Sequence, residues 1–216
     1  MKERGMIFNG EMVRAILGGR KTQTRRPIKW KQTRFTEIGE REDGSRWLWS
    51  EDAEHVCDFW HPCPFGAVGD RIWVRETWNK YGGLLTYRAD HDWIDDMRKE
   101  TVCTAKWVPS IHMPRWASRI LLEITDVRVE RVNAISPEDA ESEGLERTNF
   151  TGFGDEPGLP SYPEPDVYFD PLKKQWKEYP PEAFAGLWES IYGEGSWQAN
   201  PWVWVIEFKR VEGGAA

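Results

Sequence analysis

The longest stretch with the character of a β-strand is RILLEITDVRVERV, residues 119–132, and SPEDAESEG follows it at residues 136–144. In the first segment apolar residues recur mostly at alternate positions, which predicts a strand with one buried face. In the second, Ser136 is a suitable N-cap, Pro137 suits the first helical position, acidic residues fill the first turn, and Gly144 ends the pattern. The sequence therefore predicts a long strand followed by a short helix over 137–143.

Shorter elements extend outward from this unit in both directions. Toward the N-terminus, residues 10–17 predict a helix capped by Asn9, residues 20–26 predict an extended strand that Pro27 ends or restricts to a sheet edge, and residues 71–78 predict another strand. Toward the C-terminus, residues 181–192 predict an amphipathic helix and residues 202–210 a mostly apolar strand. Strands outnumber the short helices, so we expect a mainly β (α+β) fold, a small β-barrel with helical connections.

The chain has 216 residues, a length that suits one compact domain with long loops or a domain and a half. We expect a single domain with insertions at about 31–64, 80–117 and 146–180. The first and last of these segments are polar and irregular in pattern, which predicts long loops. No apolar run reaches the ~18 residues that a membrane helix requires, and the N-terminus lacks a secretory signal. Three cysteines in a chain of this size indicate no disulfide framework, so we expect a cytoplasmic protein without membrane association.

The net charge of −7 is unevenly distributed along the chain. Residues 1–35 carry ten basic and two acidic side chains, whereas residues 136–171 carry ten acidic side chains and one basic. Such a basic segment suits a local anionic ligand, although a solvated basic face is the alternative. The 14 tryptophans are another unusual feature: most are expected in the core, and a minority suit stacking on nucleobases.

Polar and basic side chains are densest directly after the glycine pair Gly18-Gly19. A glycine turn followed by Lys, Thr and Arg residues suits an anionic or strongly polar ligand, but the full phosphate-binding loop pattern is absent. An exposed edge strand protected by charge is the alternative. The second candidate is Glu143, a carboxylate placed unfavourably at the C-terminal end of its predicted helix.

Four potential metal ligands lie within nine residues: His55, Cys57, His61 and Cys63. Their spacing matches no common zinc finger or ribbon, so a turn with partly buried cysteines is the preferred interpretation. We therefore expect no metal and no cofactor.

Several of these motifs, in this order, resemble the ASCH domain family. They are the opening helix, Gly19-x-Lys21-x-x-Thr24-x-Arg26, Gly69-Asp70 before a strand, the segment 138–144 and the terminal strand 204–208. The stretch from Pro64 to Trp78 is similar to longer ASCH proteins of phages and prophages. The resemblance covers about 1–30, 65–79, 118–145 and 184–210, and implies a single domain with a PUA-like β-barrel.

The resemblance also implies a function. Some small bacterial ASCH proteins are amidohydrolases that deacetylate N(4)-acetylcytidine, and their Lys, Thr and Glu match Lys21, Thr24 and Glu143. Thr24 would attack the acyl carbonyl, Lys21 would take its proton, and Glu143 would pass a proton to the leaving amine. Two alternatives remain open, a non-catalytic module that binds single-stranded RNA and a ribonuclease using the same basic cleft. The residues expected to contact the nucleoside or RNA are Arg20, Gln23, Arg25, Arg26 and Glu76.

Overall fold

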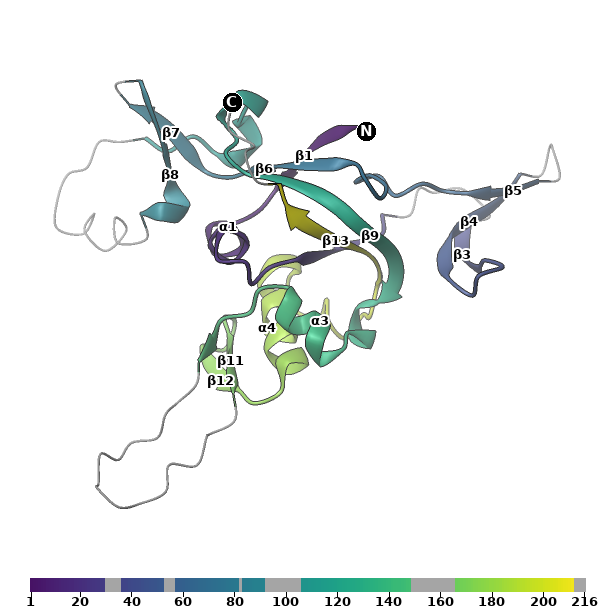
Figure 1. The fold of residues 1–216 in the computed structure, drawn as a ribbon. Helices are drawn as coiled ribbons and strands as arrows, with labels where there is room; N and C mark the ends of the chain where they lie inside the picture. The colour runs from purple at the N-terminus through teal and green to yellow at the C-terminus, as the bar shows by residue number, and fades with distance from the viewer. Residues whose placement is uncertain (30–35, 53–56, 82, 92–105, 149–165, 212–216) are drawn as a thin grey trace, which may run out of the picture.

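The computed structural model describes residues 1–29, 36–52, 57–81, 83–91, 106–148 and 166–211. The fold is mainly β with short helices, which confirms the predicted class. Its centre is a five-stranded sheet in the order β1-β6-β9-β13-β2 (Figure 1). β1 and β6 are parallel, and the other neighbours are antiparallel. The strands are β1 (Glu3–Ile7), β2 (Gln23–Pro27), β6 (Arg71–Arg75), β9 (Leu121–Arg131) and β13 (Trp202–Arg210).

The long predicted strands form the middle of this sheet. β9 falls within the predicted 119–132 segment, and β13 occupies the predicted range 202–210 and pairs with β9 along its length, with a bulge between Glu207 and Phe208. Alternate residues of β9 point into the main core, where Leu122 and Ile124 are buried beside Ile206. This alternation gives the strand its buried face.

The described strands do not close into a barrel, so the predicted closure is not observed. β1 and β2 are the two free edges of the central sheet, and Pro27 ends β2, as expected for an edge strand. In the described part of the chain, β1 and β2 are not paired through their backbones. A side chain connects them instead, because Arg26 Nη2 donates a hydrogen bond to the Ile7 carbonyl at 2.8 Å. The sheet is therefore open, with its edges linked at one point.

The three predicted helices are present, and two of them begin at the N-cap residue expected from the sequence. α1 (Gly10–Leu17) begins where Asn9 Oδ1 accepts a hydrogen bond from the Met12 amide at 2.8 Å. α3 (Pro137–Ser142) begins where Ser136 Oγ accepts one from the Asp139 amide at 3.1 Å. α4 (Pro180–Tyr192) begins with two prolines, and Figure 1 shows it beside α3 below the central sheet. Single 3₁₀ turns cover Arg88–Asp90, Ser110–His112, Arg115–Ala117 and Val132–Ala134.

Three smaller sheets lie in segments whose sequence pattern did not predict them. Residues 31–64 contain the antiparallel sheet of β3 (Thr36–Glu40), β4 (Arg46–Asp52) and β5 (Cys57–Trp60), so the expectation of an irregular loop there was wrong. Residues 146–180 contain β10 (Arg147–Thr148), β11 (Val167–Asp170) and β12 (Gln175–Lys177) around residues outside the described part. The predicted strand 71–78 is divided into β6 and β7 (Trp78–Tyr81), which pairs with β8 (Leu84–Tyr87).

The small sheet β10–β12 contacts α4 through a very close approach. Asp170 is buried at the end of β11, where Oδ1 accepts hydrogen bonds from the amides of Leu172 and Lys173 at 2.9 and 3.1 Å. Its carboxylate lies against Gly186 of α4, at the place where any larger residue would carry its Cβ. Glycine is therefore required at this position.

Candidate functional site

The candidate site is formed where the segment after α1 meets the end of α3. Gly19 adopts a positive φ of 73°, and after this turn the Lys21 amide bonds to the Ala15 carbonyl at 3.1 Å. Lys21 and Glu143 form an isolated antiparallel bridge, supported by a hydrogen bond from the Thr22 amide to the Ser142 carbonyl at 2.9 Å. The predicted strand 20–26 is therefore shorter than expected, because its first residues pair with α3 and β2 begins at Gln23.

Gly144 allows this close approach. Its φ is 89°, and a Cβ at this position would lie 2.7 Å from the Lys21 Cβ and 2.8 Å from the Ala15 Cβ. The glycine that the sequence pattern assigns to ending the helix thus also makes room for Lys21.

The side chains of Lys21 and Glu143 form a buried ion pair. Lys21 Nζ lies 2.6 Å from Glu143 Oε2 and donates a second hydrogen bond to the Glu143 carbonyl at 2.8 Å. The two side chains are 0% and 3% exposed. Burial lowers the pKa of Lys21, while the Glu143 carboxylate acts in the opposite direction. Glu143 lies at the C-terminal end of α3, where the helix dipole disfavours a negative charge, and the Lys21 ammonium offsets this effect.

Arg25 extends this pair into a charge network on one face of β2. Its Nη1 lies 3.4 Å from Glu143 Oε1, and its Nη2 lies 2.7 Å from Asp139 Oδ2 and 3.2 Å from Glu130 Oε2. Arg128 of β9 contacts the same Asp139 oxygen at 2.8 Å and Glu130 Oε1 at 2.6 Å. Burial alone raises the pKa of Asp139, but the two guanidinium groups outweigh this effect and lower it. Gln23 Nε2 adds a hydrogen bond to the Asp139 carbonyl at 2.6 Å.

Thr24 lies beside Glu143 in a pocket of about 180 Å³. Arg25 and Arg26 complete its polar side, and residues from one face of α4 form an apolar and aromatic wall. Among the described residues, Lys21 Nζ bonds to Glu143 and not to the Thr24 hydroxyl, so the carboxylate is the group that connects Lys21 with the pocket. The residues of the α4 wall are Phe184, Leu187, Trp188, Ile191 and Tyr192.

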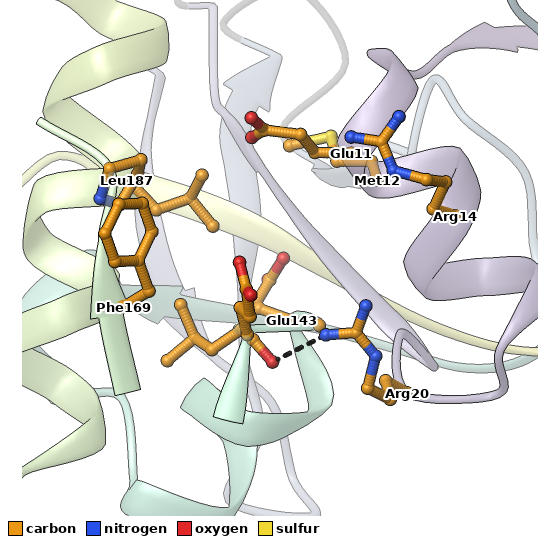
Figure 2. Close-up of a pocket in the computed structure, with 11 residues that line it drawn as sticks. Glu11, Met12, Arg14, Arg20, Glu143, Phe169 and Leu187 are labelled. Atoms are coloured by element: carbon orange, nitrogen blue, oxygen red, sulfur yellow. Dashed lines mark hydrogen bonds between the residues drawn. The ribbon is translucent and has the colours of Figure 1, made fainter. Parts of the chain in front are cut away.

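Glu143 also lines a second pocket, of about 130 Å³. Figure 2 shows Glu143 between Leu187 and Phe169 on one side and Arg20 on the other, with residues of α1 opposite. Arg20 Nη1 donates a hydrogen bond to the Leu145 carbonyl at 3.1 Å, which fixes the guanidinium at the rim. Both pockets are lined by Glu143, Leu187 and Met12, so the two spaces adjoin at these residues.

Three residues that line the first pocket carry buried hydrogen-bond donors for which the described part of the chain supplies no partner. Arg25 Nε, Arg26 Nε and Trp188 Nε1 are buried without an acceptor. A buried unpaired donor costs about 1–3 kcal/mol, so an arrangement that supplies acceptors to these groups is favoured. A ligand with carbonyl or anionic oxygens provides such acceptors after small side-chain movements.

The remaining predicted site residues lie elsewhere. Glu76 is buried after β6 and is bound by Arg119, through Nε at 2.9 Å and Nη2 at 3.1 Å, and within the described part of the chain it contacts none of Lys21, Thr24 and Glu143. Burial raises the pKa of its carboxyl group, against the effect of Arg119.

Of the four possible zinc ligands, His55 lies outside the described residues, as does the side chain of Cys57. His61 Nε2 is 2.8 Å from Ser50 Oγ, and Cys63 is buried with a free thiol. Where residues are described, no group of three or more His, Cys, Asp or Glu side chains is arranged to hold a metal ion.

Three residues of the site were missed by sequence reasoning: Asp139, Glu130 and Arg128. Asp139 was visible only as a favourable acid in the first turn of its helix. Glu130 and Arg128 lie on a long strand whose pattern gives no information about which partner each side chain meets. The α4 wall could have been inferred from the sequence, because the apolar face of this helix continues to Ile191 and Tyr192. In the structure these two side chains remain 40% and 37% exposed.

Comparisons with known protein families, with curated proteins and with solved structures find no match for this chain. In the described part of the chain, no helix combines the length and the apolar character needed to cross a bilayer.

Proposed function

We propose that this chain is an ASCH-type hydrolase that removes an acyl group from the exocyclic amine of a cytidine nucleoside, with Lys21, Thr24 and Glu143 as its catalytic residues. The observation that carries the proposal is the position of Glu143. Its carboxylate is bound to Lys21 at 2.6 Å and Glu143 lines the same pocket as Thr24, so one carboxylate contacts the amine and shares a pocket with the hydroxyl. These are the groups that amide hydrolysis by a hydroxyl nucleophile requires.

The proposed reaction proceeds in two balanced steps. Thr24 Oγ1 attacks the acyl carbonyl carbon while its proton passes through the Glu143 carboxylate to a neutral Lys21. The C–N bond then breaks as that proton returns through Glu143 to the cytosine amine, which leaves an ester on Thr24. Water hydrolyses the ester and releases the carboxylic acid. Burial supports this role, because it lowers the pKa of Lys21 and favours the neutral amine that can accept the proton.

The pocket supports a planar ring as the bound group. Its volume of about 180 Å³ is below the roughly 300–1,000 Å³ of typical small-molecule pockets, so it suits one base rather than a whole nucleotide. Phe184 and Trp188 supply an aromatic wall, and Arg25 and Arg26 supply donors for oxygen atoms on the ring. In this arrangement the ribose extends toward the second pocket beyond Glu143.

The relation to the PUA-like barrel is part of the same proposal. Arg26 of β2 donates a hydrogen bond to the Ile7 carbonyl of β1, so the two edge strands are in contact at this position. Along the chain, α1 connects the same two strands. We infer that the central sheet corresponds to such a barrel in a partly open form.

The direct test is incubation of the purified protein with N(4)-acetylcytidine, followed by mass spectrometry of the products. Cytidine and acetate are expected from the unaltered chain. Thr24→Ala should abolish their formation, Thr24→Ser should retain part of it, and Thr22→Ala should retain nearly all. Thr22 is the matched control because it is exposed and lies two residues away.

The same experiment includes labelled RNA so that the alternatives are distinguished. Unchanged nucleoside with intact, bound RNA would replace this proposal with a non-catalytic RNA-binding module. Cleaved RNA would favour the ribonuclease.

A further inference from the structure

A large hollow lies away from the candidate site, between the β3–β5 sheet and the central sheet. We call it the tryptophan groove, and its volume is about 1010 Å³. One side comes from the inserted sheet and includes Trp47 and Trp60, and the other comes from β9 and the N-terminal residues. This volume reaches the upper end of the roughly 300–1,000 Å³ found for small-molecule pockets, so the groove suits a segment of a polymer.

Within the described part of the chain, four cations of the groove form no ion pair within 4.0 Å, although Arg4 and Arg41 interact electrostatically with Asp70 and Asp43. The four cations are Lys2, Arg4, Arg41 and Arg46. A groove lined by unpaired cations attracts an anionic chain, most strongly at low ionic strength.

The acidic residues of the groove, in contrast, have partners of their own. Asp70 accepts hydrogen bonds from the amides of Lys2 and Ala67, at 2.7 and 3.3 Å. Asp126 and Glu130 are both bound by Arg128, at 3.2 and 2.6 Å. Asp43, the remaining carboxylate, accepts from the Ser45 amide at 2.8 Å. Counting Arg128, the groove is lined by five cations and four carboxylates, so it carries an excess of one positive charge.

Planar groups are stacked along the same groove. The Arg41 guanidinium lies 4.1 Å from the ring centroid of Trp47 and 5.3 Å from that of Trp60. Trp47 is held from below by an edge contact with the buried Trp204, at 4.9 Å between ring centroids. Aromatic rings and guanidinium planes are the surfaces on which unpaired bases stack, whatever the base.

We propose that the tryptophan groove binds single-stranded nucleic acid. Its cations contact phosphates, and bases stack on the Trp47–Arg41–Trp60 platform. The chain carries a net charge of −7 overall, so attraction of an anionic strand requires a locally positive surface such as this groove. The surface is separate from the Thr24 pocket and is built by strands inserted at 31–64, so it goes beyond the proposed hydrolase and does not depend on it.

The test measures the anisotropy of labelled single-stranded RNA and DNA of about 12 nucleotides at several salt concentrations. Arg46→Ala is the main variant, because Arg46 is exposed and its loss does not threaten folding. We expect weaker binding of every sequence and a salt slope reduced by about 0.7. Trp60→Ala should weaken binding by roughly 5- to 150-fold through the loss of stacking. The matched controls are Lys173→Ala and Trp116→Ala, both at exposed positions outside the groove.

Three outcomes would overturn the inference. One is the absence of binding at low salt. Another is binding that Arg46→Ala and Trp60→Ala leave unchanged while Arg20→Ala abolishes it, which would assign the nucleic acid to the Glu143 pockets. The third is equal competition by polyglutamate, which would indicate an acidic protein partner. None of these results depends on hydrolysis of N(4)-acetylcytidine, so the two proposals fail independently.

Discussion

The Lys21 ammonium and the Glu143 carboxylate lie 2.6 Å apart, although 122 residues separate them in the sequence. The same two residues also pair through their backbones. Side chains and main chain therefore fix the amine and the carboxylate relative to each other, and four predictions follow from this arrangement and its neighbours.

Loss of one partner of the buried pair should be more harmful than loss of both. Lys21→Met leaves the Glu143 carboxylate buried and short of its cation, so the free energy of unfolding should fall by about 3–5 kcal/mol. The double variant Lys21→Met with Glu143→Leu removes both charges and should be more stable than Lys21→Met alone. Urea denaturation measures both. A double variant that is less stable than the single one would contradict this account of the pair.

Gly144→Ala should destabilise the protein through two effects at once. Alanine at a positive φ costs about 1–2 kcal/mol, and its Cβ would collide with Lys21 and Ala15, which adds about 1–3 kcal/mol. Gly195→Ala is the control, since Gly195 has a φ of 77° and open space around its Cβ position. Thermal denaturation should show the larger loss for Gly144→Ala. Equal losses would mean that Lys21 adjusts without cost.

Stability in acid should depend on Asp139. Its pKa in the folded state is below the ordinary value of 3.8, because Arg25 and Arg128 outweigh the effect of burial. As the pH falls through 3.8 toward the folded pKa, the unfolded chain binds the proton first, so stability decreases. Asp139→Asn removes this contribution and should flatten the loss of stability in that window. Glu138→Gln, in the same helical turn and with the same change of net charge, should retain the original slope.

Arg26 should set the pH at which hydrolysis begins, if Lys21 accepts the proton. The neutral amine is the active form, so kcat/KM should rise as the pH rises through the lowered pKa of Lys21, below 10.5. The positive charge of Arg26 contributes to that lowering. Arg26→Gln should therefore move the rising limb to higher pH. A limb that stays in place or moves to lower pH would remove Lys21 from the role of base.

Local signals in the sequence predicted the helices and the long strands. Asn9, Ser136 and Gly144 mark helix boundaries through short-range chemistry, and the alternation in 119–132 reflects one buried face. The β3–β5 sheet was missed because its strands are rich in aromatic and charged residues without a clear period of two. Strand prediction from sequence depends on the alternation of apolar and polar residues, and polar strands in a small sheet can pair without that alternation.

The candidate site was predictable only in part. The spacing of Lys21 and Thr24 on one strand would direct them to opposite faces, and sequence reasoning had no means of placing Lys21 ahead of β2, in a bridge with Glu143. The partners of Arg25 come from α3 and β9, so their identity depends on the packing of elements more than 100 residues apart. Glu76 stood out in the sequence, but its partner is Arg119.

The contact between Asp170 and Gly186 has a consequence for what the pocket can accept. Since no side chain fits at Gly186, α4 can neither rotate about its axis nor slide along the small sheet without striking the carboxylate. Phe184, Leu187 and Trp188, on the adjoining turns, are thereby held at one angle toward Thr24. Under the proposed function, the position of the wall against which a ring would lie then depends on a glycine and an aspartate that do not themselves line the pocket.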